Sequence, residues 1–227
     1  GYLPGQLAAH HDIGYITQDP VTELSKPLSS RQVARMNNGK WALVTGNGYN
    51  STNEKAVLIV QYLDGSAPKK IYATSITGDS NGLSATRLVD LNGDGVPDVA
   101  YAGDLRGNLW KFDLSSTNDS SWSVAGGNAM FTAKSASGAV QSITTAPLYQ
   151  THPTKGLMVV FGTGQNLTVD DRTTITSQSV YGLYDFGFSL TNYKAGGVSV
   201  TSAAKSDKTS WRPSTGTRSA AMLSQSL

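Results

Sequence analysis

The chain has 227 residues, of which 15% are charged, and it contains 24 glycines and no cysteine. This composition excludes a disordered chain, a disulfide-rich scaffold, thiolate catalysis and a cysteine-ligated zinc site. The net charge of +2 is too small to indicate a nucleic-acid-binding surface, and no apolar run approaches the ~20 residues of a transmembrane segment.

Short strands dominate the predicted secondary structure, and helical periodicity is nearly absent. The clearest predicted strands are Trp41–Thr45, Ala56–Tyr62, Asp98–Ala102, Asn108–Phe112, Leu157–Phe161 and Ser179–Tyr184. A further strand is expected over Thr86–Asp90. Residues 199–227 are rich in Ser, Thr and Ala and weakly patterned, so we expect loops there, with at most one strand or short helix. The fold class is therefore predicted to be all-β.

The predicted strands pair into a repeating unit. Each unit begins with an apolar strand that ends at a glycine, and these glycines, Gly46, Gly103 and Gly162, are spaced by 57 and 59 residues. A second strand with an aromatic residue follows, and an aspartate closes each unit. The period matches a four-stranded β-propeller blade with a long loop, and blades must stack to bury both faces. We predict that residues 1–227 form a single propeller domain, or a fragment of one, with about four blade-like units.

The segment Asp90-Leu-Asn92-Gly-Asp94-Gly-Val96-Pro-Asp98 has the spacing of a calcium-binding loop. Side-chain oxygens stand at positions 1, 3, 5 and 9, a backbone carbonyl stands at position 7, and Gly95 at position 6 allows the sharp turn. Position 12, a bidentate glutamate in an EF-hand, is Tyr101 here, and both flanks are predicted strands. We therefore expect Ca²⁺ on a strand hairpin, with ligands from Asp90, Asn92, Asp94, Val96 and Asp98.

The alternative to a calcium site is a hairpin turn that is rich in Asp and Asn and holds no metal. Three carboxylates lie within nine residues, and without a cation they repel one another. This repulsion favours the calcium site.

Two patterns that resemble enzyme motifs are better explained as turns. Gly78-Asp-Ser80-Asn-Gly82 fits the Gly-x-Ser-x-Gly pattern of a hydrolase, but a predicted strand follows it where that motif needs a helix. Gly46-Asn-Gly48 and Gly162-Thr-Gly164 each follow a strand, yet they lack the third glycine and the helix of a nucleotide-binding loop. We therefore predict that the chain is not an enzyme.

Several segments together carry a family resemblance. They are Gly39-Lys-Trp-Ala-Leu-Val-Thr-Gly-Asn-Gly-Tyr-Asn50, the calcium loop, Gly103-Asp-Leu-Arg-Gly-Asn-Leu-Trp-Lys-Phe-Asp-Leu114 and Val160-Phe-Gly-Thr-Gly-Gln165. Over roughly residues 10–190 the chain resembles the C-terminal propeller domain of the PilY/PilC family of type IV pilus biogenesis proteins and tip adhesins. The calcium hairpin is also similar to those of integrin-type (FG-GAP) propellers.

This resemblance implies a secreted bacterial protein of the periplasm, outer membrane or pilus tip that promotes pilus assembly through protein–protein contacts. It further implies that calcium in the loop controls the balance between pilus extension and pilus retraction, and with it twitching motility and cell adhesion. The expected partners are proteins of the pilus machinery such as minor pilins, while host or surface ligands would bind regions outside this chain. The first residues lack the pattern of a signal peptide, so targeting information is expected outside the chain as well.

Two other functions remain open. The first is an FG-GAP-like adhesion module in which calcium is purely structural. A structural site stays filled, whereas a regulatory site fills and empties near the ambient calcium concentration. The second is a quinoprotein-like oxidoreductase, because Gly103–Leu114 also resembles the repeat of quinoprotein propellers. That activity needs an axial cofactor site with a stacking tryptophan and a vicinal disulfide or its equivalent, and the chain has no cysteine.

Overall fold

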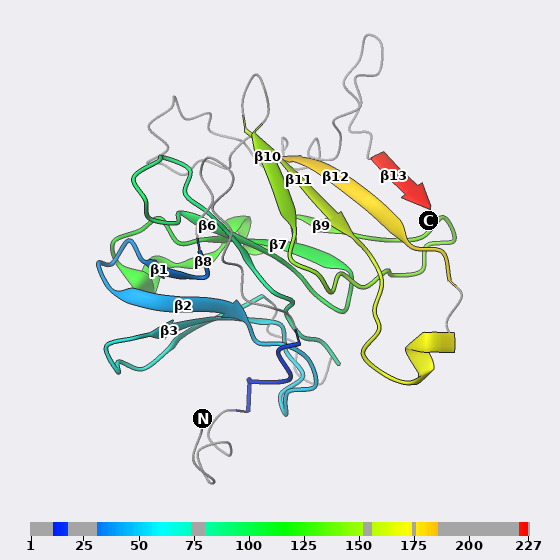
Figure 1. Ribbon diagram of the computed structural model, residues 1–227, viewed down its shortest axis with the longest axis horizontal. Helices are drawn as coiled ribbons and strands as arrows, with labels where there is room; N and C mark the ends of the chain where they lie inside the picture. The colour runs from blue at the N-terminus through cyan, green and yellow to red at the C-terminus, as the bar shows by residue number, and fades with distance from the viewer. Residues whose placement is uncertain are drawn as a thin grey trace.

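The computed structural model of the chain describes residues 11–17, 31–73, 80–151, 156–173, 176–185 and 223–226. These residues form three antiparallel sheets (Figure 1). The all-β prediction is confirmed. In this part of the chain, no helix has the length and apolar character needed to cross a membrane.

Each sheet has the antiparallel strand order of a propeller blade. Blade 1 contains β1 (Val33–Arg35), β2 (Trp41–Gly46), β3 (Val57–Tyr62) and β4 (Lys69–Tyr72). Blade 2 contains β5 (Arg87–Val89), β6 (Val99–Gly103), β7 (Asn108–Asp113), β8 (Ser123–Val124) and β9 (Phe131–Thr132). Blade 3 contains β10 (Leu148–Thr151), β11 (Leu157–Gly162), β12 (Ser179–Asp185) and β13 (Leu223–Ser226). The 3₁₀ turns are η2 (Asp119–Ser121), η3 (Ala125–Gly127) and η4 (Asp170–Thr173).

The predicted strands are confirmed to within one residue at each end. They correspond to β2, β3, β6, β7, β11 and β12, and the strand expected before the calcium loop is β5. Strands of two to four residues at the blade edges, such as β8 and β4, were not predicted because they are too short and polar to show a period. Of the weakly patterned stretch 199–227, only strand β13 lies within the described residues.

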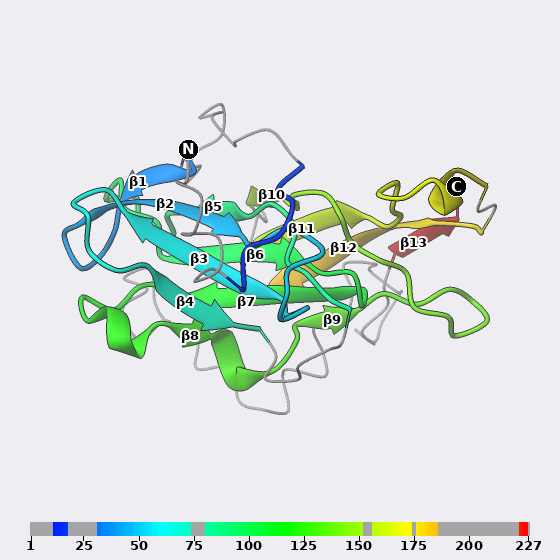
Figure 2. The same ribbon diagram turned by 90° about the horizontal axis from the view of Figure 1, so that it is seen from below.

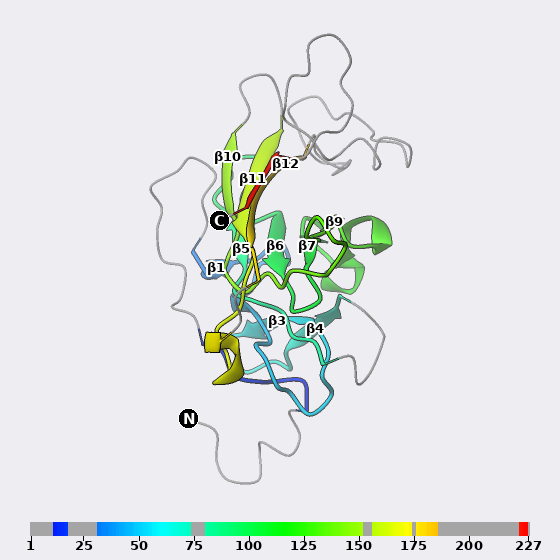
Figure 3. The same cartoon turned by 90° about the vertical axis from the view of Figure 1, so that its right-hand side faces the viewer.

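Blade 2 is packed between the other two blades, as Figure 3 shows. Successive side chains of a strand point to opposite faces of its sheet. On β6, Ala100 and Ala102 belong to the core shared with blade 1, while Val99 and Tyr101 belong to the core shared with blade 3. Strand β4 of blade 1 also lies beside β8 of blade 2 (Figure 2). Every residue of β6 is buried, and this explains its continuous apolar sequence.

The glycines that end the first strand of each unit mark the contacts between blades. A Cβ on Gly46 would lie 1.9 Å from the carbonyl oxygen of Ser84 in the blade 2 segment, and a Cβ on Gly103 would lie 2.2 Å from Ile143. A side chain at either of these two positions would therefore clash with the neighbouring segment. At Gly162, in blade 3, a Cβ would meet no atom of the described residues within 4 Å.

The outer faces of blades 1 and 3 carry exposed apolar side chains. Trp41 on β2 is 57% exposed and Leu148 on β10 is 52% exposed. The described residues hold three of the about four units that the period predicts. The expectation of a single propeller domain, or a fragment of one, therefore stays a prediction.

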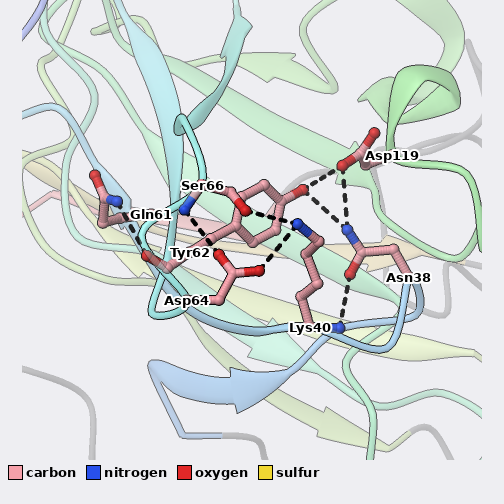
Figure 4. Close-up of polar contacts among 7 residues, drawn as sticks. All are labelled: Asn38, Lys40, Gln61, Tyr62, Asp64, Ser66 and Asp119. Atoms are coloured by element: carbon pink, nitrogen blue, oxygen red, sulfur yellow. Dashed lines mark hydrogen bonds and ion pairs between the residues drawn. The ribbon is translucent and has the colours of Figure 1, made fainter.

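A polar cluster joins blade 1 to the β7–β8 connection of blade 2 (Figure 4). The hydroxyl of Tyr62 donates to Asp119, and the amide of Asn38 donates to both of these side chains at 3.0 and 3.1 Å. Burial raises the pKa of Tyr62, and its bond to the Asp119 carboxylate raises it further. That same bond lowers the pKa of Asp119, so the carboxylate is ionised at neutral pH. Lys40 lies over the ring of Tyr62, with its Nζ 4.9 Å from the ring centre.

Removal of the Tyr62 hydroxyl is expected to loosen this junction. Tyr62→Phe should lower the free energy of unfolding by about 1–2 kcal/mol, because Asp119 loses a hydrogen bond that is assisted by its charge. Urea denaturation measures the change. Tyr15→Phe is the matched control, since the Tyr15 side chain is 68% exposed. An equal effect of the two substitutions would show that the hydroxyl does not join the blades.

Candidate metal centre

The predicted calcium loop connects β5 to β6 at one end of blade 2. The amide of Asp98 donates to the carbonyl oxygen of Val89 at 2.9 Å, and Val89 is the cross-strand partner of Val99. The loop is therefore part of a strand hairpin, as the sequence predicted, and not of a helix–loop–helix unit.

Side chains of the loop accept hydrogen bonds from the backbone amides of the loop itself. Asp90 accepts bonds from the amides of Gly93 and Gly95, both at 2.7 Å, one on each carboxylate oxygen. Asn92 accepts from Asp94, and Asp94 accepts from the amide two residues further on. Gly95 has a φ of 86°, which L side chains rarely adopt, so the sharp turn predicted at this glycine is confirmed.

Asp98, at the end of the loop, bonds back to the start of the loop. Its Oδ2 accepts from the amides of Leu91 at 2.8 Å and Asn92 at 3.3 Å. Burial raises the pKa of Asp98, the two amides lower it, and the charges of Asp90 and Asp94 raise it again, with a net upward shift. The described ion pairs of the chain include none to these three aspartates. Within the described residues, the loop thus concentrates negative charge with no ion pair to a cationic side chain.

The donor set of the loop suits a hard cation. Each carboxylate oxygen has two lone pairs, so Asp90 and Asp98 keep acceptor capacity beyond their bonds to the backbone. Among the described residues, no three His, Cys, Asp or Glu side chains form a group that holds a metal by themselves. A calcium ion here would also need the side-chain oxygen of Asn92 and the backbone carbonyl of Val96 as ligands, as the spacing predicts. The exposed Asp94 side chain would have to rotate toward the ion.

The hairpin that carries the loop is bonded to both neighbouring blades. On one side, the amide of Asn37 in blade 1 donates to the carbonyl oxygens of Pro97 and Leu114 at 3.1 and 3.0 Å. On the other side, Nε of Arg87 on β5 donates to the carbonyl oxygen of Pro147, which precedes β10, at 3.0 Å. The hairpin therefore has hydrogen-bond contacts to both blade 1 and blade 3.

Tyr101, at position 12 of the motif, points away from the loop into the core between blades 2 and 3. Its hydroxyl donates to Oδ2 of Asp185 at 2.6 Å, and the same oxygen forms an ion pair with Nζ of Lys111 at 2.7 Å. The Lys111 and Asp185 side chains are only 1% and 3% exposed. Sequence reasoning missed this cluster, although a lysine inside the apolar strand Asn108–Asp113 was a visible signal of a buried charge.

The patterns that resembled enzyme motifs are turns in the described residues. The side-chain oxygen of Asn47, between Gly46 and Gly48, accepts hydrogen bonds from the backbone amides of Val57 and Leu83. This turn therefore forms hydrogen bonds within blade 1 and to the segment that leads into blade 2. Ser80 to Gly82 lead into an isolated bridge between Leu83 and Asp104 and not into a helix, while Gly78 and Asp79 lie outside the described residues.

Comparison with known proteins gives one consistent family. The family model described as the PilY1 beta-propeller domain matches residues 16–204. The type IV pilus biogenesis factor PilY1 of Pseudomonas aeruginosa is 44% identical over 203 residues, which are 80% of this chain and 17% of that protein. A PilY1 homolog from Xylella fastidiosa is 36% identical over 181 residues, covering 73% of this chain and 12% of that protein.

A solved structure agrees with the sequence comparisons. The crystal structure of the C-terminal domain of P. aeruginosa PilY1 superposes with a TM-score of 0.69 at 42% identity, covering 79% of this chain and 39% of that one. The chain thus spans less than a fifth of the curated relatives it matches. The resemblance seen in the sequence is confirmed: this chain belongs to the PilY1 β-propeller family.

Proposed function

We propose that this chain is a calcium-modulated propeller module of a type IV pilus biogenesis factor. It acts without catalysis, through contacts with proteins of the pilus machinery such as minor pilins, at the bacterial cell surface or the pilus tip. The relatives that support this role are named as pilus biogenesis factors. The observation that carries the calcium part is the loop Asp90–Asp98, whose three carboxylates have no described ion-pair partner.

The proposed regulation follows from charge. Without a cation, Asp90 and Asp94 repel the buried Asp98, and this repulsion favours an open, mobile hairpin. A cation bound by the loop removes the repulsion and favours the closed form. Because Asn37 and Arg87 bond the hairpin to blades 1 and 3, closure also orders the surface between blades. A partner that recognises only the ordered surface gains apparent affinity in proportion to calcium occupancy.

Two substitutions of one residue test regulation in cells. Asp94→Ala removes a ligand and leaves the loop empty, whereas Asp94→Lys places a fixed positive charge where the cation would lie. If calcium controls extension against retraction, the two variants of the full protein should shift surface piliation and twitching in opposite directions. Immunoblots of sheared pili and motility-zone diameters measure the outcome.

The control for this pair is Asp113→Ala in the same blade, because Asp113 makes a comparable turn with Ser115 outside the loop. It should leave both readouts unchanged. If Asp94→Ala and Asp94→Lys both match wild type, the regulatory role is wrong and calcium is at most structural, as in an FG-GAP-like adhesion module.

A further inference from the structure

A depression of about 870 Å³ lies where the turns of the three blades meet, beyond the ends of β2, β6 and β11. Its lining includes Tyr49 and Asn50 from blade 1, Leu105 from blade 2, and Gln165 and Asn166 from blade 3. The volume is within the range of small-molecule sites, roughly 300–1,000 Å³. No residue of the calcium loop lines it, so the depression is a separate feature of the molecule.

The charge of the lining disfavours several classes of ligand. Of the described residues that line the depression, Glu54 is the one with a charge, and none is lysine, arginine or histidine. Phosphates and carboxylates are bound by such cations or by rows of backbone amides. The lining therefore disfavours nucleotides, acidic peptides and anionic headgroups, and it favours a neutral ligand rich in hydrogen-bonding groups.

The lining of the depression includes amide and aromatic side chains, which are suited to binding the hydroxyl groups and C–H faces of a ligand. The amides of Asn50 and Asn166 form no side-chain hydrogen bond with the described residues, and each supplies two donors and one acceptor. Beside them, the ring of Tyr15 is 68% exposed. Its backbone is held by two hydrogen bonds with Tyr49, at 2.7 and 3.1 Å, so the ring is presented from a fixed position. An exposed ring with an apolar face and a polar tip suits a ligand that has both C–H and O–H faces.

The backbone around the depression is strained. Asn50, Glu54 and Ser80 have φ values of 59°, 49° and 46°, and they are the non-glycine residues with positive φ in the described part of the chain. All three line the depression. Such conformations cost free energy and persist where the surrounding structure holds them, which is often at binding sites.

The floor of the depression is rigid and joins the blades. The buried side chain of Asn81 donates to Asp104 and accepts from the amide of Leu105, both at 3.0 Å. The hydroxyl of Tyr49 donates to the carbonyl oxygen of Thr144 across the site at 3.2 Å.

The loop 165–168 at the edge of the depression is fixed by Asp171. The Asp171 carboxylate accepts from the Gln165 side chain at 2.7 Å and from the amides of Leu167 and Thr168 at 2.8 Å. The bond from Gln165 and those from the amides lower the pKa of Asp171 to about 2, so it stays ionised in this role.

We propose that this depression binds a neutral carbohydrate. The ring of Tyr15 packs against the C–H face of a sugar, the amides of Asn50 and Asn166 pair with its hydroxyls, and Glu54 accepts from a further hydroxyl. The strained turns hold these groups in place before binding, which reduces the entropy lost on association. Sialylated sugars bind less well, because their carboxylate meets Glu54 and no cation.

Binding is tested with the purified protein on an array of neutral and sialylated glycans. Saturation-transfer NMR then compares affinities for the strongest neutral glycan and its sialylated form. Tyr15→Ala and Asn166→Ala are each expected to weaken binding about tenfold, the loss of one stacking or hydrogen-bonding contact. Both residues are exposed, so the circular dichroism should be unchanged.

Two substitutions of the same residue types serve as controls. Trp41→Ala removes an exposed aromatic side chain, and Asn128→Ala removes an exposed amide, both outside the depression. Neither should change glycan affinity. The proposal is overturned if no neutral glycan binds, if the Tyr15 and Asn166 variants bind like wild type, or if the sialylated form binds more tightly than the neutral one.

Discussion

Lys111→Met is expected to lower the free energy of unfolding by about 3–5 kcal/mol, the cost of removing one member of a buried ion pair. The substitution keeps most of the volume of the side chain, so the effect reports the lost charge and not a cavity. Asp185, which is 3% exposed, would then lie in the core without the Lys111 ammonium, while the hydrogen bond from Tyr101 remains. Because this contact joins blade 2 to blade 3, chemical denaturation should show the loss in the main transition.

An exposed pair of the same residue types is the matched control. Lys40 pairs with Asp64 at 3.0 Å, but both side chains are more than 40% exposed, so Lys40→Met should lower the unfolding midpoint far less than Lys111→Met does. The double substitution Lys111→Met with Asp185→Leu should recover part of the lost stability, because it removes both charges. If Lys111→Met costs no more than Lys40→Met, the buried pair does not hold the two blades together.

Calcium titration is expected to give a dissociation constant on the order of 10⁻⁶ to 10⁻⁴ M. The affinity is moderate because position 12 of the loop, Tyr101, donates to Asp185 and supplies no carboxylate. Magnesium should bind much more weakly, since it demands a smaller octahedral shell. Calorimetry on protein treated with a chelator measures both ions, and absence of heat with calcium contradicts the site.

Asp94→Ala is expected to abolish calcium binding while the β circular dichroism is retained. Asp94 is exposed at the tip of the loop, and its described hydrogen bond is local, to the amide of Val96. Asp113→Ala, in a turn of the same blade outside the loop, should bind calcium like wild type. If both variants lose binding, the substitutions act through the fold and not through a ligand.

Much of the architecture was predictable from the sequence because the signals are local. The central strands show apolar runs between Gly, Asn and Asp turns, and glycines close the first strand of each unit. The proposed ligands lie within nine residues, so their spacing in the sequence is nearly their arrangement in the loop. Edge strands such as β8 could not be predicted, since two residues carry no period and pair only because a neighbouring strand is present.

By itself, the sequence determined the all-β class, the blade-sized repeat, the loop Asp90–Asp98 and the family. Only the tertiary structure decided which contacts join the blades. Lys111 and Asp185 are separated by 74 positions, and nothing local in either strand specifies the other as its partner. The depression likewise combines Tyr15, Asn50 and Asn166 from turns far apart in the chain. Such pairings depend on how blades stack around a common axis, and stacking brings distant segments together without leaving a period in the sequence of either one.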